Sequence, residues 1–354
     1  MKRPRFFHFG LIAATVFIAA ILLSVTGSKA QGPAKFNQPG NILITDQFNN
    51  RVIEIDPNGN IVWQFGSGPG NTTPSAIIGT NDAERVNDLT LMSGTGIPAG
   101  PISTTHCKKG CVDNRVLLVD VRGNIVWQYG EFGVTGSGFN QLNTPVQNTY
   151  LHQSSGDDHI LITDQGNGRI IEVRRSDKAI VWEYDGLNNP NAAELLTNGN
   201  ILISDENNNQ ALEVRHTMPS TVKATFKTAG GLDFSGVAFA SRLPSGHTLI
   251  TDSNNSRIVE TDVAGDVFWQ YFTNNRTGSN SAPLPTRAVR LANGDTLISD
   301  QFNHQVIRVN MVGAIVASYG TINNPGFNPG TAIEMNGPYS AYVIGDYTGI
   351  TPPF

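Results

Sequence analysis

The chain has 354 residues, of which 39% are hydrophobic and 15% charged, and its formal net charge is −5. A chain of that length can bury a sizeable hydrophobic core. A small protein held together mainly by disulfides is excluded, because two cysteines are too few to stabilise this length of chain. The 37 glycines and the low charge content favour many short strands joined by turns. Collagen and coiled coils are excluded, because neither Gly-X-Y nor heptad periodicity occurs.

The N-terminus has the pattern of a secretory signal peptide. A positive stretch and an apolar run come first, and the small residues Ser28 and Ala30 suit signal peptidase. We expect cleavage after residue 30, leaving one domain over 31–354 in a secreted or periplasmic, extracytoplasmic location; an uncleaved anchor is the alternative. Cleavage removes four positive charges and no acids, giving −5 − 4 = −9. This charge argues against nucleic acid, or a membrane after cleavage, as a partner.

One unit recurs along the chain. Five segments ending in Leu-Ile-Thr/Ser-Asp or a close variant begin at Asn41, His159, Asn200, His247 and Asp295. In each, Asn follows the Asp by three residues and Arg or Gln by five, and then a second apolar run begins. A Gly turn and a third run close the unit, and this third run holds all four tryptophans of the chain, Trp63, Trp127, Trp182 and Trp269. The runs are short, β-branched and bounded by Asn, Asp and Gly, so we predict strands.

A sixth copy, at 114–129, keeps only the later half of the unit, because an insertion at roughly 92–111 obscures its first strand. A further strand precedes each unit, as at 285–291. Four antiparallel strands per unit are typical of a propeller blade. The first unit lacks this leading strand, and the C-terminal segment 338–344 has its pattern with no unit behind it. We therefore predict an all-β, six-bladed β-propeller in which this segment completes the first blade; a seventh blade from 331–346 is the alternative.

Two features carry possible metal ligands. Cys107 and Cys111 are expected to form a local disulfide in an oxidising compartment. The alternative is a metal site with His106, although two thiolates and one imidazole leave zinc one ligand short. In the repeated Asp-x-x-Asn-x-Arg motif we expect the carboxylate to cap the turn and pair with Arg, with calcium binding as the alternative. We predict no cofactor and no metal site.

The segment Asp-Gln-Phe-Asn-Asn-Arg-Val-Ile-Glu-Ile-Asp-Pro-Asn-Gly at 46–59 resembles an NHL-type propeller repeat. The ending Gly-Asn-Ile-Val-Trp-Gln-Phe at 59–65 is similar to repeats of the bacterial arylsulfotransferase-like propellers. This resemblance covers nearly the whole chain after the signal and implies the fold. Propellers of this kind include binders, lyases, lactonases and sulfotransferases. A sulfotransferase would need a nucleophilic histidine in the channel, and the channel positions predicted below contain none.

Function is expected where the repeats differ, above all along the channel. When the leading strands are aligned on their closing Leu or Ile, one column holds Arg85, Gln147, Ala192, Phe239, Arg287 and Ser340. Two residues later, a column on the same face holds Asn87, Thr149, Glu194, Ser241, Val289 and Tyr342. Arginines in this channel would favour an anionic ligand. The ligand-binding candidates from these columns are Arg85, Asn87, Gln147, Glu194 and Arg287.

The turns between the second and third strands are expected to rim one mouth of the channel. Phe48 and Phe302 lie in the first and last blades, which ring closure makes neighbours, and His304 is close by. These side chains could stack on and hydrogen-bond a sugar or aryl ligand, and inward packing of both rings is the alternative.

The sequence therefore favours a secreted binding or scaffold module over an enzyme. Its partner would be a small anionic or carbohydrate ligand, or a protein, at the channel mouth. The alternative is a propeller enzyme, either a lyase or an arylsulfotransferase-like transferase, with His304 as its catalytic candidate.

Overall fold

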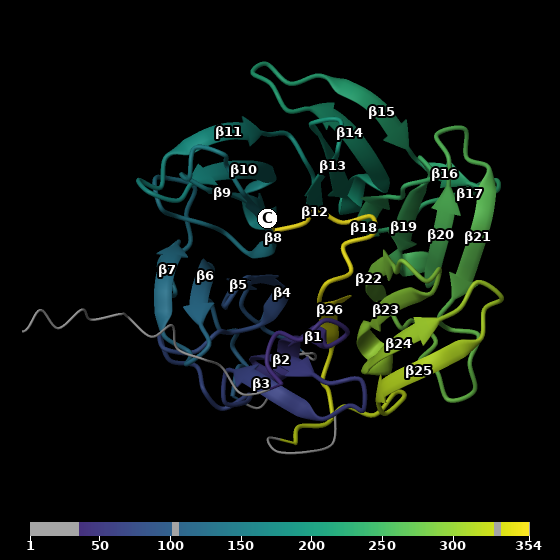
Figure 1. Cartoon of the computed structure of the whole chain (residues 1–354), viewed down its shortest axis with the longest axis horizontal. Helices are drawn as coiled ribbons and strands as arrows, with labels where there is room; N and C mark the ends of the chain where they lie inside the picture. The colour runs from purple at the N-terminus through teal and green to yellow at the C-terminus, as the bar shows by residue number, and fades with distance from the viewer. Residues whose placement is uncertain (1–34, 101–105, 329–333, 354) are drawn as a thin grey trace, which may run out of the picture. The chain divides into compact units, whose positions relative to one another are not determined.

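A computed structural model describes residues 35–100, 106–328 and 334–353. They form six four-stranded antiparallel sheets arranged as blades around a central axis (Figure 1). The all-β, six-bladed propeller predicted from the repeats is therefore confirmed. The expected signal peptide, 1–30, lies outside the described residues. No helix in the described part of the chain is long and apolar enough to span a membrane.

Each blade begins with an inner strand at the channel and ends with an outer strand at the periphery (Figure 1). The strands of blades 1 to 3 are β26 (Pro338–Val343), β1 (Ile42–Asp46), β2 (Arg51–Ile55) and β3 (Ile61–Phe65); β4 (Thr80–Val86), β5 (Leu89–Gly94), β6 (Arg115–Asp120) and β7 (Ile125–Tyr129); and β8 (Pro145–Leu151), β9 (His159–Asp164), β10 (Arg169–Arg174) and β11 (Ile180–Tyr184). Those of blades 4 to 6 are β12 (Pro190–Leu195), β13 (Asn200–Asp205), β14 (Gln210–Arg215) and β15 (Val222–Phe226); β18 (Val237–Arg242), β19 (Thr248–Asp252), β20 (Arg257–Thr261) and β21 (Val267–Phe272); and β22 (Pro285–Arg290), β23 (Thr296–Asp300), β24 (Gln305–Val309) and β25 (Ile315–Gly320). A small hairpin of β16 (Thr228–Ala229) and β17 (Leu232–Asp233) connects blades 4 and 5.

The C-terminal strand closes the ring. β26 pairs antiparallel with β1, opposing Val343 to Ile42 and Tyr342 to Leu43. The predicted closing strand is thus confirmed, and β26, the strand within the described part of 331–346, belongs to blade 1 instead of a seventh blade. Because the first and last segments of the propeller share one sheet, the inner side of β1 is paired instead of forming an open sheet edge.

The repeated motif is built into the fold. Asp46 Oδ2 accepts hydrogen bonds from Asn49 Nδ2 and Arg51 Nε, both at 2.8 Å, and its Oδ1 accepts from the backbone N–H of Asn336 at 2.7 Å. A short 3-10 turn follows the Asp in five blades, namely η1 (Gln47–Asn49), η2 (Gln165–Asn167), η3 (Glu206–Asn208), η4 (Ser253–Asn255) and η5 (Gln301–Asn303). Each of these turns ends in a residue with a left-handed backbone conformation, which directly follows the motif Asn. These residues are Asn50, Gly168, Asn209, Ser256 and His304. The expected pairing with Arg is confirmed at Asp46, Asp164 and Asp252, whereas none of the five carboxylates caps the 3-10 turn that follows it.

Blade 2 supplies the same carboxylate from a different place. Gly94 occupies the position of the motif Asp, opposite Arg115 in the strand pairing. Asp113, two residues before the start of β6, accepts from Arg115 Nε at 2.5 Å and from the backbone N–H of Ile78 at 2.8 Å. A Cβ on Gly94 would lie 2.4 Å from an oxygen of this carboxylate. In blade 2 the acid therefore comes from the segment before β6 and still reaches the arginine at the start of that strand.

The tryptophans join neighbouring blades. Each indole Nε1 donates to a backbone carbonyl in the turn before the outer strand of the next blade. The pairs are Trp63 with Val121 at 3.0 Å, Trp127 with Arg175 at 2.9 Å, Trp182 with Thr217 at 3.3 Å and Trp269 with Met311 at 3.1 Å. Their recurrence at one place in the repeat thus reflects packing between blades.

Candidate functional site

The inner strands place two columns of side chains on the channel. By strand register the first column is Asp82, Gln147, Ala192, Phe239, Arg287 and Ser340, and the second is Glu84, Thr149, Glu194, Ser241, Val289 and Tyr342. The predicted columns are correct for five blades.

In blade 2 the predicted column was wrong. Arg85 points between blades 1 and 2, where its guanidinium bonds Glu54 Oε2 at 2.7 Å and lies 4.2 Å from the centre of the Phe36 ring. Asn87 lies in the turn after β4 with φ 52°. The alignment took Leu89 as the strand's closing residue, but Leu89 opens β5, because the connecting turn is shorter here than in the other blades. The channel positions of blade 2 are Asp82 and Glu84, so this blade contributes acids and no arginine.

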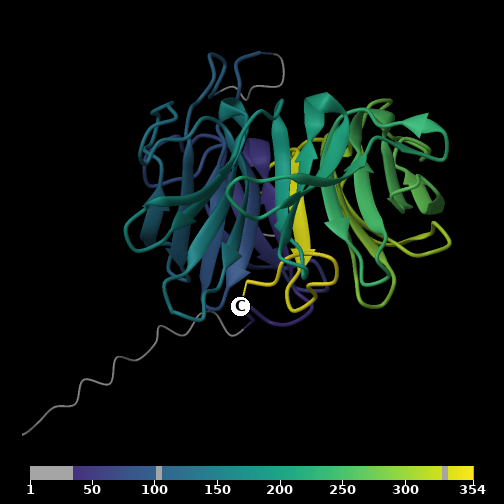
Figure 2. The ribbon, with the colours of Figure 1, turned by 90° about the horizontal axis from the view of Figure 1, so that it is seen from above.

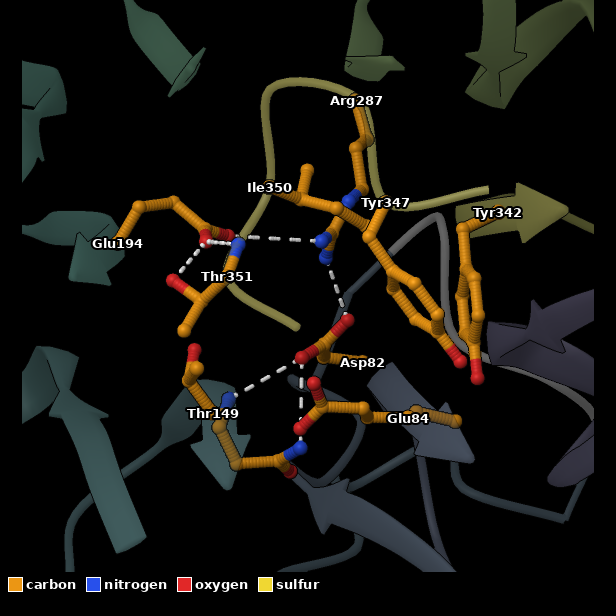
Figure 3. A pocket seen from close by; sticks show the side chains of 11 residues that line it. Asp82, Glu84, Thr149, Glu194, Arg287, Tyr342, Tyr347, Ile350 and Thr351 are labelled. Atoms are coloured by element: carbon orange, nitrogen blue, oxygen red, sulfur yellow. Dashed lines mark hydrogen bonds and ion pairs between the residues drawn. The ribbon is translucent and has the colours of Figure 1, made fainter. Parts of the chain in front are cut away.

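A buried ion network crosses the channel (Figure 3). Arg287 Nη1 lies 2.6 Å from Asp82 Oδ1, its Nη2 lies 3.6 Å from Glu194 Oε1, and its guanidinium stacks 4.4 Å from the centre of the Phe239 ring. Gln147 Nε2 donates to Glu194 Oε1 at 2.7 Å. The structure thus brings together three predicted residues, Gln147, Glu194 and Arg287. It also neutralises the arginine that was expected to attract an anion.

Burial changes the pKa values of the three carboxyl groups in the channel. Desolvation raises the pKa of Asp82, Glu84 and Glu194, and the positive charge of Arg287 opposes this shift at each of them. Glu84 also accepts the backbone N–H of Tyr150 at 2.7 Å. Three buried carboxyl groups thus face one arginine, and the positive charge of Arg287 stabilises their ionised forms.

The C-terminal segment closes one end of this channel. Thr351 donates its backbone N–H and its hydroxyl to Glu194 Oε2, at 2.8 and 2.7 Å, and its Oγ1 accepts from the backbone N–H of Leu195 at 3.0 Å. Ile350 packs against Phe239. Figure 2 shows this chain end on the side of the ring opposite the insertion that follows β5. The larger opening of the described part of the channel is therefore on the insertion side.

At that side the channel widens into a cavity of about 420 Å³, which we call the funnel. Its lining comes from the insertion, the entries to the inner strands and the 3-10 turns, and its polar side chains include Gln47, Asn81, Asn143, Gln165, Asn189, Glu206 and Tyr339. The described part of this lining contains no Lys, Arg or His. Glu206 supplies the carboxylate in the described part of the lining, and burial raises the pKa of Glu206 to about 7.

The two mouth aromatics lie together, with Phe48 buried and Phe302 partly buried. Phe48 and Phe302 stack with ring centres 6.3 Å apart, as ring closure predicted. Phe48 is buried and packs with Ile78 and Ile97 under the insertion. The inward-packing alternative therefore describes the position of Phe48, and neither ring lines the funnel. The disulfide expected nearby is present, joining Cys107 and Cys111.

His304 holds two blades together. Its Nδ1 accepts a hydrogen bond from the backbone N–H of Gly337, the residue before β26, at 3.1 Å. Asparagines occupy the same place in other blades and accept from the residue before the next inner strand, through the pairs Asn50–Gly79, Asn114–Thr144 and Asn209–Gly236. The His304 side chain is buried and does not line the funnel. Its geometry is that of an inter-blade contact, which gives the catalytic interpretation no support.

Replacing His304 with Asn should leave stability at neutral pH unchanged and remove part of its pH dependence. Burial lowers the pKa of His304 to about 4, whereas an unfolded histidine titrates near about 6.5. Its stabilising contribution is therefore complete above pH ~6.5 and is lost as the pH falls toward 4. In urea unfolding from pH 7 to 4.5, wild type should lose more stability than His304→Asn. His304→Ala should cost about 1–3 kcal/mol at pH 7, because the Gly337 N–H loses its acceptor. Identical pH slopes for wild type and His304→Asn would contradict this role.

Several residues that line the channel or the funnel were not found from the sequence. Asp82 and Glu84 were missed because one turn is short, and Thr351 because nothing in the pattern marks a segment folding back into the channel. Glu206 follows the motif Asp at a position where three other repeats have glutamine, and this difference in charge was an available signal. Among the described residues, no group of three or more His, Cys, Asp or Glu side chains is arranged to hold a metal ion.

Comparison with known proteins identifies the fold and no family. No protein-family model and no curated protein matches the chain. A protein of unknown function from Bacteroides caccae is 14% identical over 81% of this chain and 97% of that chain, with a TM-score of 0.54. A chain of the nidogen/laminin complex is 11% identical over 78% and 92%, with a TM-score of 0.51. Virginiamycin B lyase from Staphylococcus aureus is 14% identical over 70% and 71%, with a TM-score of 0.45. At these identities the likeness shows the fold alone.

Proposed function

We propose that this chain is an extracytoplasmic binding module that takes a carbohydrate in the funnel. The observation that carries the proposal is a cavity of about 420 Å³ lined by amide side chains at the open end of a channel whose other end is closed. Amides both donate and accept hydrogen bonds, as sugar hydroxyls do, and the small number of charged groups matches a neutral polyhydroxylated ligand.

An anionic ligand has less support. The arginine of the channel lies below the funnel and is paired with Asp82 and Glu194, so little of its charge is free. A second hollow of about 520 Å³, between the loop after β3 and His106, has hydrogen-bonding side chains, among the described residues, only at Ser67, Asn71 and His106, which are fewer than the funnel offers. The funnel is therefore the better site for a sugar.

The test is a binding screen of neutral oligosaccharides against residues 31–354, followed by a blocked variant. A ligand at a hundred times its Kd should raise stability by about 2.7 kcal/mol, which a thermal shift detects. Gln165→Trp places a large ring in the funnel and should abolish binding, whereas Lys223→Trp, on the exposed outer strand β15, should not. Loss of binding in His304→Asn, with binding retained in Gln165→Trp, would overturn the proposal.

A further inference from the structure

Glu206 occupies a position that is repeated around the funnel. It is the first residue of η3, and the first residues of the other four 3-10 turns are Gln47, Gln165, Ser253 and Gln301. At two of these positions the amides bond to each other, since Gln301 Nε2 donates to Gln47 Oε1 at 2.7 Å. A carboxylate thus replaces a neutral group at one place in the ring, where the backbone geometry is otherwise the same.

The surroundings leave this carboxylate available to a ligand. Its Oε2 accepts from Asn189 Nδ2 at 2.9 Å, and no ion pair within the described residues involves Glu206. Two titratable groups are nearby. Tyr339 donates its hydroxyl to Asn191 Oδ1 at 2.9 Å, and Asp205 is bonded to Asn208, Gln210 and the backbone of Asn188.

We propose that Glu206 selects a ligand that carries a protonated amine, such as an amino sugar. This rests on the proposed function, because it assigns the ligand's charge within the same funnel. A primary ammonium group brought to Glu206 would gain a charge-assisted hydrogen bond in a partly desolvated cavity without competition from a protein cation in the lining. The net charge of −5 also draws cationic ligands to the protein.

The binding should depend on pH in a defined direction. Burial raises the pKa of Glu206 to about 7, so this side chain is partly protonated at neutral pH, and an amine-bearing ligand prefers the ionised form. A primary alkyl amine stays protonated up to about pH 9, near the range of an ordinary lysine. Affinity should therefore rise from pH 6 to pH 8 for the amine ligand and stay level for a neutral one.

The experiment compares 2-aminoethyl glycosides of cellobiose, lactose and maltose with their 2-hydroxyethyl isosteres by calorimetry. For at least one sugar, wild type should bind the amine form about 10-fold tighter or more at pH 8. Glu206→Gln installs the residue found at three of the four equivalent turns and should reduce that ratio to about 1. Gln165→Glu should increase the ratio, because it adds a second carboxylate at an equivalent position.

The outcomes separate the two proposals. If neither form of any glycoside binds, the proposed function fails for these sugars and the inference falls with it. If both forms bind wild type equally, the carbohydrate function stands and the role of Glu206 is overturned. A preference for the amine that persists in Glu206→Gln, with an unchanged pH profile, would also overturn it.

Discussion

Arg287→Met should destabilise the propeller by about 3–5 kcal/mol at pH 7, because it removes the cation of a buried network and leaves its acids uncompensated. Arg287 contacts Asp82 at 2.6 Å and lies 3.6 Å from Glu194, and all three side chains are buried. The loss should appear in urea unfolding as a lower midpoint with an unchanged slope.

The pH dependence of this loss has a definite sign. Burial already raises the pKa of Asp82 and Glu194, and removing Arg287 should raise both further. An acid with a folded pKa above its unfolded value destabilises the fold at higher pH, so the deficit should be largest near pH 8 and shrink toward pH 5.

The matched control for Arg287→Met is Arg308→Met. Arg308 pairs with Asp295 at 3.1 Å but its side chain is 40% exposed, so the cost should stay below about 1 kcal/mol. Equal costs for the two variants, or a deficit that grows on acidification, would contradict the account of the channel network.

Asp113→Ala should also cost about 3–5 kcal/mol, and Gly94→Asp should rescue it. Without Asp113, Arg115 remains buried with no carboxylate on its Nε, and the backbone N–H of Ile78 loses its acceptor. An Asp at position 94 would stand opposite Arg115 in the same register that joins Asp46 to Arg51. The double variant should therefore recover most of the lost stability.

On its own, Gly94→Asp should be destabilising, because its Cβ would lie 2.4 Å from the Asp113 carboxylate. The two single variants and the double variant form a thermodynamic cycle, measured by urea unfolding. The coupling energy should be favourable and larger than about 2 kcal/mol. Additive effects would show that the carboxylates of Asp113 and of the motif Asp do not fill one structural position.

The repeats made the blade architecture predictable. The motif Asp, the Gly turn and the tryptophan recur at fixed offsets because each serves contacts that every blade needs. Ring closure was predictable because the first unit lacks a leading strand and the C-terminal segment 338–344 has the pattern of a leading strand with no unit behind it. The pairing of β26 with β1 confirms that inference.

The site was harder to predict because it depends on departures from the repeat. A short turn after Val86 shifted the register by three residues and put Arg85 in the place of Asp82. The sequence placed His304 beside Phe302 at the expected channel mouth, but the residues before β26 had to be placed before its bond to Gly337 could be seen. Closure of the channel by Thr351 involves residues outside any repeat, so periodicity carries no information about it.

The most direct test of the central claim is a crystal structure of residues 31–354 with the tightest glycoside from the screen. The account predicts the sugar in the funnel, bonded to amide side chains such as Asn189, with any amine at Glu206 and with Thr351 still bonded to Glu194. A sugar bound beside His304 and Gly337, at the hollow near His106, or in a channel opened by displacement of the C-terminal segment would contradict it.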